Sequence, residues 1–381
     1  MDKTKSKRKI LALVLITASA TFILCMTGFR LYFGASFSLW GDIRTYAQAR
    51  AVIDKNYVGD YEESDVTDAS IAAAVGALDD DWSYYMTADQ YQAYLKRMEN
   101  SFDGIGISYI RDEQTREIQV STVTLGSPAE QAGIVTGDWI LEIDGQSVSE
   151  LDSEAISTLI SEKLGSTVML RVRDEAGAER DVEVASESFQ VAPVVYELLE
   201  DGIGYIQIAN FNANSAENAI AAIEDLRSQG CAALIFDVRD NPGGSVQELL
   251  NLLDYILPEG EMFVTVDKDG NKKIDTSDAQ SVEMPMAVLV NENSYSAAEF
   301  FPAILQAYDW AEIVGEPTTG KGRSQITVRL HDGSAIHISS KRYFMPGGVD
   351  LSETGGMVPD YVVENDGETD LQLEKAVSLF K

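Results

Sequence analysis

A serine stands where it could act as a nucleophile. Ser296 lies in segment 291–299 (NENSYSAAE), between a buried strand expected at Met286–Val290 and a helix expected from about 296 to 308. At the start of a helix, the macrodipole favours negative charge that develops on the hydroxyl. Ser294 and Ser296 are also good helix caps, and this turn by itself favours capping over catalysis.

A lysine between two glycines follows 25 residues later (321 − 296). Lys321 lies in segment 320–325 (GKGRSQ), and Gln325 comes four residues after it (325 − 321). A lysine in this setting is conspicuous because the surrounding region is acidic and poor in lysine. Taken alone, it would still be interpreted as an exposed cation.

A second strand-to-helix turn carries paired glycines. Gly243 and Gly244 follow a buried strand expected at 232–238 and precede a helix that runs through Leu257. Glycines free the backbone to point N–H groups into a cleft at a helix N-terminus, which favours an oxyanion or another anion there. A phosphate loop and a plain turn are the alternatives, but no Walker lysine follows.

The elements that must position these residues fall into three stretches. Residues 36–100 have helical spacing, with Thr87 and Gln90 placed as a capping box, and we expect packing, substrate-cap or dimer contacts there. From 101 to 188, short strands and two helices make a self-contained module. From about 191, strands and helices alternate, which is the α/β pattern, and sites in such folds lie at the carboxyl ends of strands.

The module at 101–188 resembles a PDZ domain, in particular the PDZ domains of bacterial exported proteases. The resemblance rests on GIGI (104–107), SPAEQAGI (127–134) and DWILEIDG (138–145). It implies that Gly104, Ile105, Gly106 and Ile107 form a loop whose N–H groups cradle a free C-terminal carboxylate. The ligand would then add as a strand beside the next segment.

The serine and lysine segments together resemble the tail-specific, or C-terminal processing, peptidases of family S41. In that family the serine lies in S-x-S-A-x-E and the base lysine in G-K-G-x-x-Q, so Ser296, Lys321 and Gln325 take the catalytic positions. NPGG (241–244), VGEPTTGKG (314–322) and VPD (358–360) match in order. Three flanking residues depart from the pattern, which implies an altered substrate preference: Tyr295, Ala298 and Thr319.

The implied chemistry needs no histidine. Ser296 would give its proton to Lys321, which accepts it only when neutral, and burial lowers a lysine pKa. Gln325 would hydrogen-bond the amine and hold it in place. The N–H groups of Gly243 and Ala297 would stabilise the oxyanion before water hydrolyses the acyl-enzyme.

Composition limits the partners. The chain has 381 residues and a net charge of −33, so no basic surface is available for nucleic acid.

Residues 10–29 are uncharged and long enough to cross a bilayer, after a basic stretch at the start of the chain. We therefore expect an uncleaved anchor with the rest of the chain outside the cytoplasm, a single-pass cell-membrane location. A cleaved signal peptide is the alternative.

Two other functions stay open at this point. A Ser-His-Asp triad would use His331 or His337, which lie on an expected hairpin with Asp332-Gly333 at its turn. A catalytically inactive PDZ-containing sensor would bind peptides without cleaving them. Intact Ser296, Lys321 and Gln325 argue against the sensor.

A metal or thiol site is not favoured. Asp267, Asp269, Asn271 and Asp275 imitate the start of an EF-hand, but Lys272 replaces its glycine, and a charged hairpin is the better interpretation. Cys231 begins an apolar strand without a neighbouring histidine, and Cys25 lies in the apolar run, so neither a disulfide nor a zinc site is expected. We expect no cofactor.

These inferences define an α+β protein. We expect a cytoplasmic tail at 1–9, a membrane-spanning helix at 10–33, a helical region at 34–100, a PDZ domain at 101–188 and the S41 core at 189–381. The resemblance implies an α/β core of ClpP/crotonase-like type. It also implies a serine endopeptidase that the PDZ domain gates and that cleaves exported or membrane proteins near free, flexible C-termini. A homodimer is a further expectation.

Overall fold

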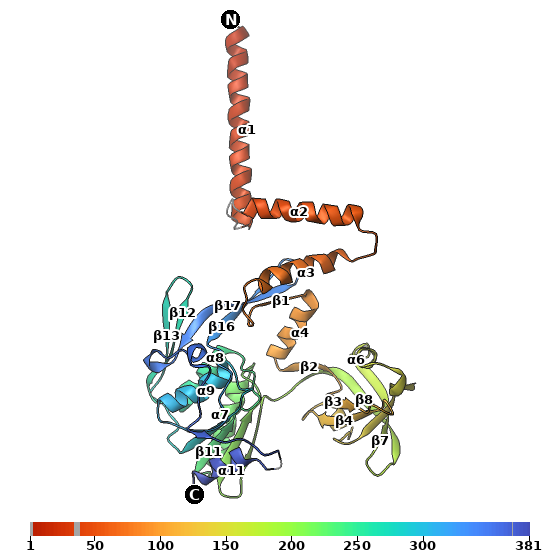
Figure 1. Cartoon of the computed structure of the whole chain (residues 1–381), viewed down its shortest axis with the longest axis vertical. Coiled ribbons are helices and arrows are strands. Elements are labelled where there is room, and N and C mark those ends of the chain that lie inside the picture. The colour runs from red at the N-terminus through yellow and green to blue at the C-terminus, as the bar shows by residue number, and fades with distance from the viewer. Residues whose placement is uncertain (1–2, 34–38, 368) are drawn as a thin grey trace. The chain divides into compact units, whose positions relative to one another are not determined.

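The computed structural model describes the backbone of residues 3–33, 39–367 and 369–381, and the side chains of 12–28 and of 41–381 except 368. The chain divides after Thr67 into two compact units (Figure 1). The first unit holds α1 (Lys3–Phe33), α2 (Leu39–Asn56) and the start of α3 (Glu63–Gly76). All of the residues expected to carry chemistry lie in the second unit.

The N-terminal helix overturns one expectation. The predicted membrane span lies inside α1, but no helix in the described ranges is long and apolar enough to cross a bilayer. The prediction rested on an uncharged, apolar run at residues 10–29. The predicted membrane-spanning helix and the single-pass location are therefore wrong, whereas the tail expected at 1–9 stays a prediction. Of the predicted tail, residues 1–2 lie outside the described residues.

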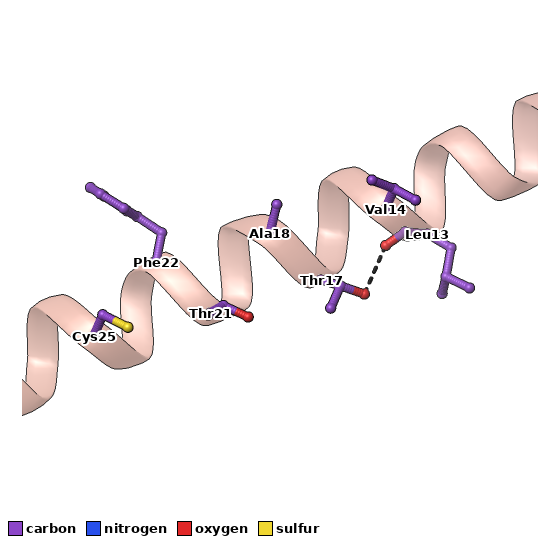
Figure 2. Close-up of a pocket in the computed structure, with 7 residues that line it drawn as sticks. All are labelled: Leu13, Val14, Thr17, Ala18, Thr21, Phe22 and Cys25. Atoms are coloured by element: carbon purple, nitrogen blue, oxygen red, sulfur yellow. Dashed lines mark hydrogen bonds between the residues drawn. The ribbon is translucent and has the colours of Figure 1, made fainter.

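One side of α1 carries a shallow hollow of about 640 Å³ (Figure 2). Residues three and four apart line it, from Leu13 to Cys25, and the Thr17 hydroxyl donates to the carbonyl of Leu13 at 2.9 Å. Its side chains are aliphatic, aromatic, hydroxyl and thiol groups on a single helix. It brings together no acid, base and nucleophile, so this hollow is not a candidate active site.

The segment before the first large sheet contains a short strand and a capped helix. The strand β1 (Tyr84–Met86) precedes α4 (Ala88–Met98), and the predicted capping box is confirmed. The Gln90 N–H donates to the Thr87 hydroxyl at 3.3 Å, and the Gln90 side-chain oxygen accepts from the Thr87 N–H at 3.0 Å. The dimer contacts expected of this region stay a prediction.

A seven-stranded sheet forms the module at 101–190, in the order β2-β8-β7-β5-β4-β3 with β6 paired to β5. Alternate strand residues and α6 (Ser153–Ser161) enclose its aliphatic core, which includes Ile118, Ile140 and Leu170. β3 is an edge strand: among the described strands it pairs with β4 alone. The other bounds are β2 (Ser101–Gly104), β3 (Ile107–Arg111), β4 (Ile118–Val123), α5 (Pro128–Gln131), β5 (Trp139–Ile143), β6 (Gln146–Ser147), η1 (Val148–Glu150), β7 (Ser166–Arg173) and β8 (Glu179–Gln190).

A six-stranded sheet in the order β18-β15-β14-β11-β10-β9 forms the α/β core, and its pairs are parallel except β9 with β10. Leu234 and Phe236 of β11 pack on one face with α7, α8 and α9, whereas Ala233 and Ile235 pack on the other with α11. Burial on both faces explains the continuous apolar runs of β11 and β14. The bounds are β9 (Val194–Leu198), β10 (Ile203–Ile208), α7 (Ser215–Ser228), β11 (Ala233–Asp237), α8 (Val246–Ile256), β14 (Met286–Val290), α9 (Ala297–Ala307), β15 (Glu312–Gly315), α10 (Leu351–Thr354), β18 (Tyr361–Val362) and α11 (Leu371–Ser378).

A five-stranded antiparallel sheet joins distant parts of the sequence. Its order is β1-β17-β12-β13, with β16 also paired to β17. The register sets Tyr84 opposite His337, so β1, which precedes the PDZ module, lies beside a strand near the C-terminus. The bounds are β12 (Gly260–Asp267), β13 (Lys272–Ser277), β16 (Arg323–Arg329), β17 (Ala335–Phe344) and η2 (Pro346–Gly348). This pairing brings the segment before β1 to the candidate site.

Candidate active site

The two strand-to-helix turns singled out in the sequence lie side by side. β11 and β14 are parallel neighbours, so the turns that follow them meet at one edge of the sheet. Side chains join them: the Ser294 hydroxyl donates to the carbonyl of Val238 at 2.8 Å, and the Asn291 side chain donates to the Asp240 carboxylate at 2.9 Å. Ser294 is fully buried, so its hydroxyl serves the turn and is not accessible to substrate.

Ser296 occupies a strained position at the start of α9. Its backbone has φ 59° and ψ −124°, a combination that costs energy for any residue other than glycine. The residue is only partly buried, and its backbone N–H donates to Oε2 of Glu299 at 2.8 Å. The turn therefore holds the serine outside helical geometry, and its hydroxyl lines a cavity.

Glu299 ties that turn to the lysine segment. Its carboxylate is fully buried and accepts the backbone N–H of Lys321 at 2.8 Å and the hydroxyl of Thr318 at 2.7 Å, together with the N–H of Gly320. No role was predicted for Glu299 from the sequence. The available signal was the serine followed three residues later by glutamate at a helix start.

Lys321 lies with Ser296 in one cavity of about 590 Å³. Its Nζ lies 4.4 Å from the centroid of the Trp82 ring and 5.7 Å from that of Tyr295. Burial lowers the pKa of the amine to about 8, although the carboxylates of Glu299 and Asp80 favour the charged form. In the described part of the chain Nζ has no ion-pair partner, so the amine is available for proton transfer.

Gln325 lines the same cavity but does not hydrogen-bond Lys321. Its Nε2 donates to the carbonyl of Arg323 and to the hydroxyl of Ser339, each at 3.1 Å. Gln325 and Ser339 face each other across β16 and β17. The structure thus brings the three predicted catalytic side chains into one cavity. Gln325 is held there by its hydrogen bond to Ser339 of β17.

The predicted oxyanion donors are neighbours of Ser296. A Cβ on Gly243, whose φ is 86°, would lie 2.9 Å from Cβ of Ser296 and 3.0 Å from the nitrogen of Ala297, so only glycine fits. The N–H of Gly243 donates to the side-chain oxygen of Asn241 at 2.8 Å. Within the described ranges the N–H of Ala297 has no acceptor.

The two histidines differ. His337 lines the cavity, and its Nδ1 lies 2.8 Å from the hydroxyl of Thr327, with no carboxylate bonded to the ring among the described residues. Burial, with the nearby Lys321 charge, lowers its pKa to about 4. His331 is exposed and outside the cavity lining. A Ser-His-Asp triad therefore lacks its acid.

The segment before β1 also reaches this site. Packing, substrate-cap or dimer contacts were expected of residues 36–100, but no contact with Lys321 was predicted. The Trp82 ring contacts Lys321. The Tyr84 ring packs against the His337 ring, and the two ring centroids lie 4.9 Å apart. Ser83 accepts the N–H of Ser339 at 3.0 Å. No local periodicity marks these residues, because their partners lie more than 200 positions away.

The predicted peptide loop connects β2 to the edge strand β3. The carbonyls of Ile105 and Gly106 accept N–H groups of Ala129 and Thr124 at 2.8 and 2.9 Å. Gly106, at φ 84°, is required because a Cβ would meet that of Ser127 at 2.2 Å. Within the described chain the N–H groups of Ile105 and Gly106 have no acceptor, and the loop runs from Gly104 to Ile107 beside a free edge.

The EF-hand-like segment is a hairpin. Asp267 ends β12, and its carboxylate accepts the N–H of Asp269 and of Asn271, each at 2.9 Å. No group of three metal-binding side chains occurs among the residues that the structure describes. Burial raises the pKa of the Cys231 thiol, which disfavours the thiolate.

An α/β core with a strained serine and a partly buried lysine at the carboxyl ends of its strands is typical of a serine hydrolase. Comparison with known proteins specifies the class: the profile of peptidase family S41 matches residues 202–363, and that of the PDZ domain matches residues 119–174.

Individual relatives agree. The carboxy-terminal processing protease CtpA of Bacillus subtilis is 29% identical over 94% of this chain and 79% of its own. A carboxyl-terminal-processing protease of Picosynechococcus sp. is 30% identical over 81% of this chain and 78% of its own. The structure of the photosystem II D1 C-terminal processing protease aligns with a TM-score of 0.50 at 27% identity over 84% of this chain and 86% of its own. This chain belongs to the carboxyl-terminal-processing serine proteases of family S41 and carries a PDZ domain.

A putative S41 protease of Bacteroides fragilis shares the fold, with a TM-score of 0.60 at 18% identity over 86% of this chain and 92% of its own. The likeness of the core to ClpP/crotonase-like folds stays a prediction.

Proposed function

We propose that Ser296 is the nucleophile of this protease and Lys321 its general base. The observation that carries the proposal is their shared cavity, in which burial lowers the pKa of Lys321 to about 8. The neutral amine takes the proton of Ser296 as the hydroxyl attacks the peptide carbonyl. The ammonium then protonates the leaving amine, and water, deprotonated by the same lysine, hydrolyses the acyl-enzyme.

Gln325 acts as a positioning residue in this scheme. Its amide nitrogen is engaged by Arg323 and Ser339, so any bond to the lysine must use its side-chain oxygen, which can accept from the protonated amine. Gln325 would then hold Lys321 in the state that follows proton transfer. This assignment explains why loss of Gln325 should be milder than loss of Lys321.

The oxyanion would form next to Gly243 and Ala297. Ala297 offers an N–H at the start of α9, where the helix dipole adds to its field. Gly243 packs directly against Ser296, but its N–H already donates to Asn241 at 2.8 Å. The second donor therefore becomes available when that N–H is shared between Asn241 and the oxyanion.

The PDZ domain would bind the substrate's C-terminus. The unpaired N–H groups of Ile105 and Gly106 suit a carboxylate, and the free edge of β3 suits an added peptide strand. We assign residues 101–188 to this domain and 189–381 to the peptidase core. Relatives are named for carboxyl-terminal processing, and one for the photosystem II D1 protein, so we propose flexible C-termini of proteins as substrates here.

Replacement of Ser296 tests this function directly. Ser296→Ala should abolish hydrolysis of a C-terminal reporter peptide and leave the fold and peptide binding intact. Ser294→Ala is the matched control, because Ser294 is buried in the same turn and should cost stability more than activity. Activity-based labelling with a fluorophosphonate should follow the same pattern. Full hydrolysis by Ser296→Ala would refute the assignment.

A further inference from the structure

The segment between α3 and β1 enters the active site and is fixed there. β1 pairs with β17 through Tyr84 and His337, Tyr85 and Ile336, and Met86 and Ala335. That pairing places Trp82 and Ser83, which directly precede β1, against Lys321 and Ser339 respectively. They come from a region to which the sequence assigned no chemistry.

A continuous set of hydrogen bonds connects these residues to Gln325. The Gln325 amide donates to the Ser339 hydroxyl at 3.1 Å, and the Ser339 N–H donates to the Ser83 hydroxyl at 3.0 Å. The Ser83 hydroxyl in turn donates to the Asp80 carboxylate at 2.5 Å. Ser83 is only 7% exposed, so water competes little for these bonds.

The same residues contact the lysine. The Trp82 ring lies under Nζ of Lys321 at 4.4 Å, a distance at which an aromatic face attracts an ammonium. Trp82 also packs against Tyr295, next to the nucleophile, with centroids 5.7 Å apart. Nζ is thus enclosed by aromatic rings from two segments that are far apart in the sequence.

Asp80 contributes charge as well as hydrogen bonds. Burial acts to raise its pKa, but hydrogen bonds from Ser83 and Ser339 hold that pKa below its usual range, so the carboxylate is ionised. Arg323 lies 3.8 Å from it. The charged or titratable groups that face Lys321 are therefore Asp80 from this segment, Glu299 from α9, His337 from β17 and Tyr295 from the turn before α9.

We propose that Asp80, Trp82 and Ser83 form a positioning element of the Ser296–Lys321 site. Ser83 and Asp80 hold Gln325 through Ser339, Trp82 fixes the lysine amine, and the Asp80 carboxylate sets how readily that amine gives up its proton. The inference rests on the proposed roles of Ser296 and Lys321. It adds to them that the site is complete only when the segment before the PDZ domain is docked on β17.

A purely structural role for this segment makes a different prediction. If residues 80–83 only anchored β1, their replacement would lower the amount of folded enzyme without moving its pH dependence. If Asp80 acts on Lys321, removal of its charge destabilises the ammonium. The pH at which kcat reaches half its maximum should then fall.

The test compares two adjacent carboxylates in the full chain. Asp80→Asn keeps a hydrogen-bond acceptor for Ser83 but removes the charge, and Asp81→Asn makes the same charge change on an exposed neighbour. With a fluorogenic peptide, we expect Asp80→Asn to lower the pH midpoint of kcat by roughly half a unit to one unit. Asp81→Asn should leave it unmoved. Identical profiles for the two variants would overturn the proposal.

A second variant covers the case in which Asp80→Asn does not fold. Arg323→Gln removes an exposed cation beside Asp80, strengthens the field of that carboxylate and should raise the midpoint instead. A midpoint that stays or falls in Arg323→Gln would count against the proposal. Thermal melts of each variant identify loss of folded protein.

The hydrogen-bonded path has its own readout. Ser83→Ala should lower kcat about tenfold, because it removes one hydrogen bond to a charged group. KM should stay unchanged. Combined with Gln325→Ala, Ser83→Ala should cause little further loss, because both act through Ser339. Additive losses would refute the hydrogen-bonded path through Ser339.

Ser296→Ala assayed in parallel separates the catalytic assignment from the positioning role. Retained activity in Ser296→Ala refutes the catalytic assignment, whereas an unmoved pH profile in Asp80→Asn refutes only the positioning role.

Discussion

The backbone N–H groups of Ser296 and Lys321 donate to the same atom, Oε2 of Glu299, each at 2.8 Å. One buried carboxylate thus sets the separation of two segments that are 25 residues apart in sequence (321 − 296). The geometry of the serine and the lysine therefore depends on a residue that has no part in the chemistry.

Replacement of Glu299 should damage both stability and activity. In Glu299→Gln, one amide NH2 would face backbone N–H donors, and we expect a loss of about 2–4 kcal/mol in the free energy of unfolding. Activity per folded molecule should also fall, because Ser296 and Lys321 would separate. Urea denaturation and active-site titration measure the two effects. Glu312→Gln, an exposed glutamate on β15, is the control, and equal behaviour of both variants would contradict the role of Glu299.

The pH dependence should report Lys321. With a pKa of about 8, roughly a tenth of the amine is neutral at pH 7, so kcat should rise through a single deprotonation centred near pH 8. Lys321→Arg and Lys321→Ala should be inactive, the first because guanidinium stays charged. Steady-state kinetics from pH 6 to about 10 checks this. Activity in Lys321→Arg would exclude the lysine as base.

The histidines provide the control for that profile. The pKa of His337 is lowered to about 4, so this ring is neutral throughout the range in which Lys321 titrates. Replacement of His331 and His337 by Gln together should therefore leave the midpoint in place. A midpoint that moves in the double variant would return the histidine mechanism to consideration.

Burial of Lys321 should lower the stability of the folded state. Its folded-state pKa of about 8 lies below the ordinary value of 10.5, so burial of the charged amine costs up to about 3 kcal/mol below pH 8. This penalty disappears as the pH rises from about 8 to 10.5, because the unfolded state then loses its advantage in binding the proton. Lys321→Met should be more stable than wild type at pH 7, and this gain should shrink above pH 8. Chemical denaturation across pH measures it, and a less stable Lys321→Met would contradict it.

The PDZ loop should distinguish peptide ends. Peptides with a free carboxylate and an apolar last residue should bind better than their amides, because the N–H groups of Ile105 and Gly106 can donate hydrogen bonds to a carboxylate. Titration calorimetry with Ser296→Ala protein avoids cleavage during the measurement. Equal affinities would exclude carboxylate capture at this loop.

If the PDZ domain gates access to the active site, deletion of residues 103–185 should change kcat/KM, and an unchanged value would refute gating.

Local sequence was sufficient to predict the elements that carry the site. β14 has the predicted bounds, Met286–Val290, because a run of apolar residues between turn residues defines a strand without reference to its partners. The family motifs likewise located Ser296, Lys321 and Gln325 by spacing alone. The predicted membrane span was wrong, because no helix among the described residues is long and apolar enough to cross a bilayer.

Tertiary structure alone decided what surrounds those residues. The depressed pKa of Lys321 results from burial, and burial depends on Trp82, which lies 239 positions earlier (321 − 82). The position of His337 in the cavity without a carboxylate partner, and the engagement of Gln325 by Ser339, depend on the pairing of β1, β16 and β17. Periodicity and motif spacing describe neighbours along the chain, whereas charge, desolvation and hydrogen bonding depend on neighbours in space. For this reason Ser296 and Lys321 could be predicted from sequence, but the roles of Glu299 and of residues 80–83 required the folded chain.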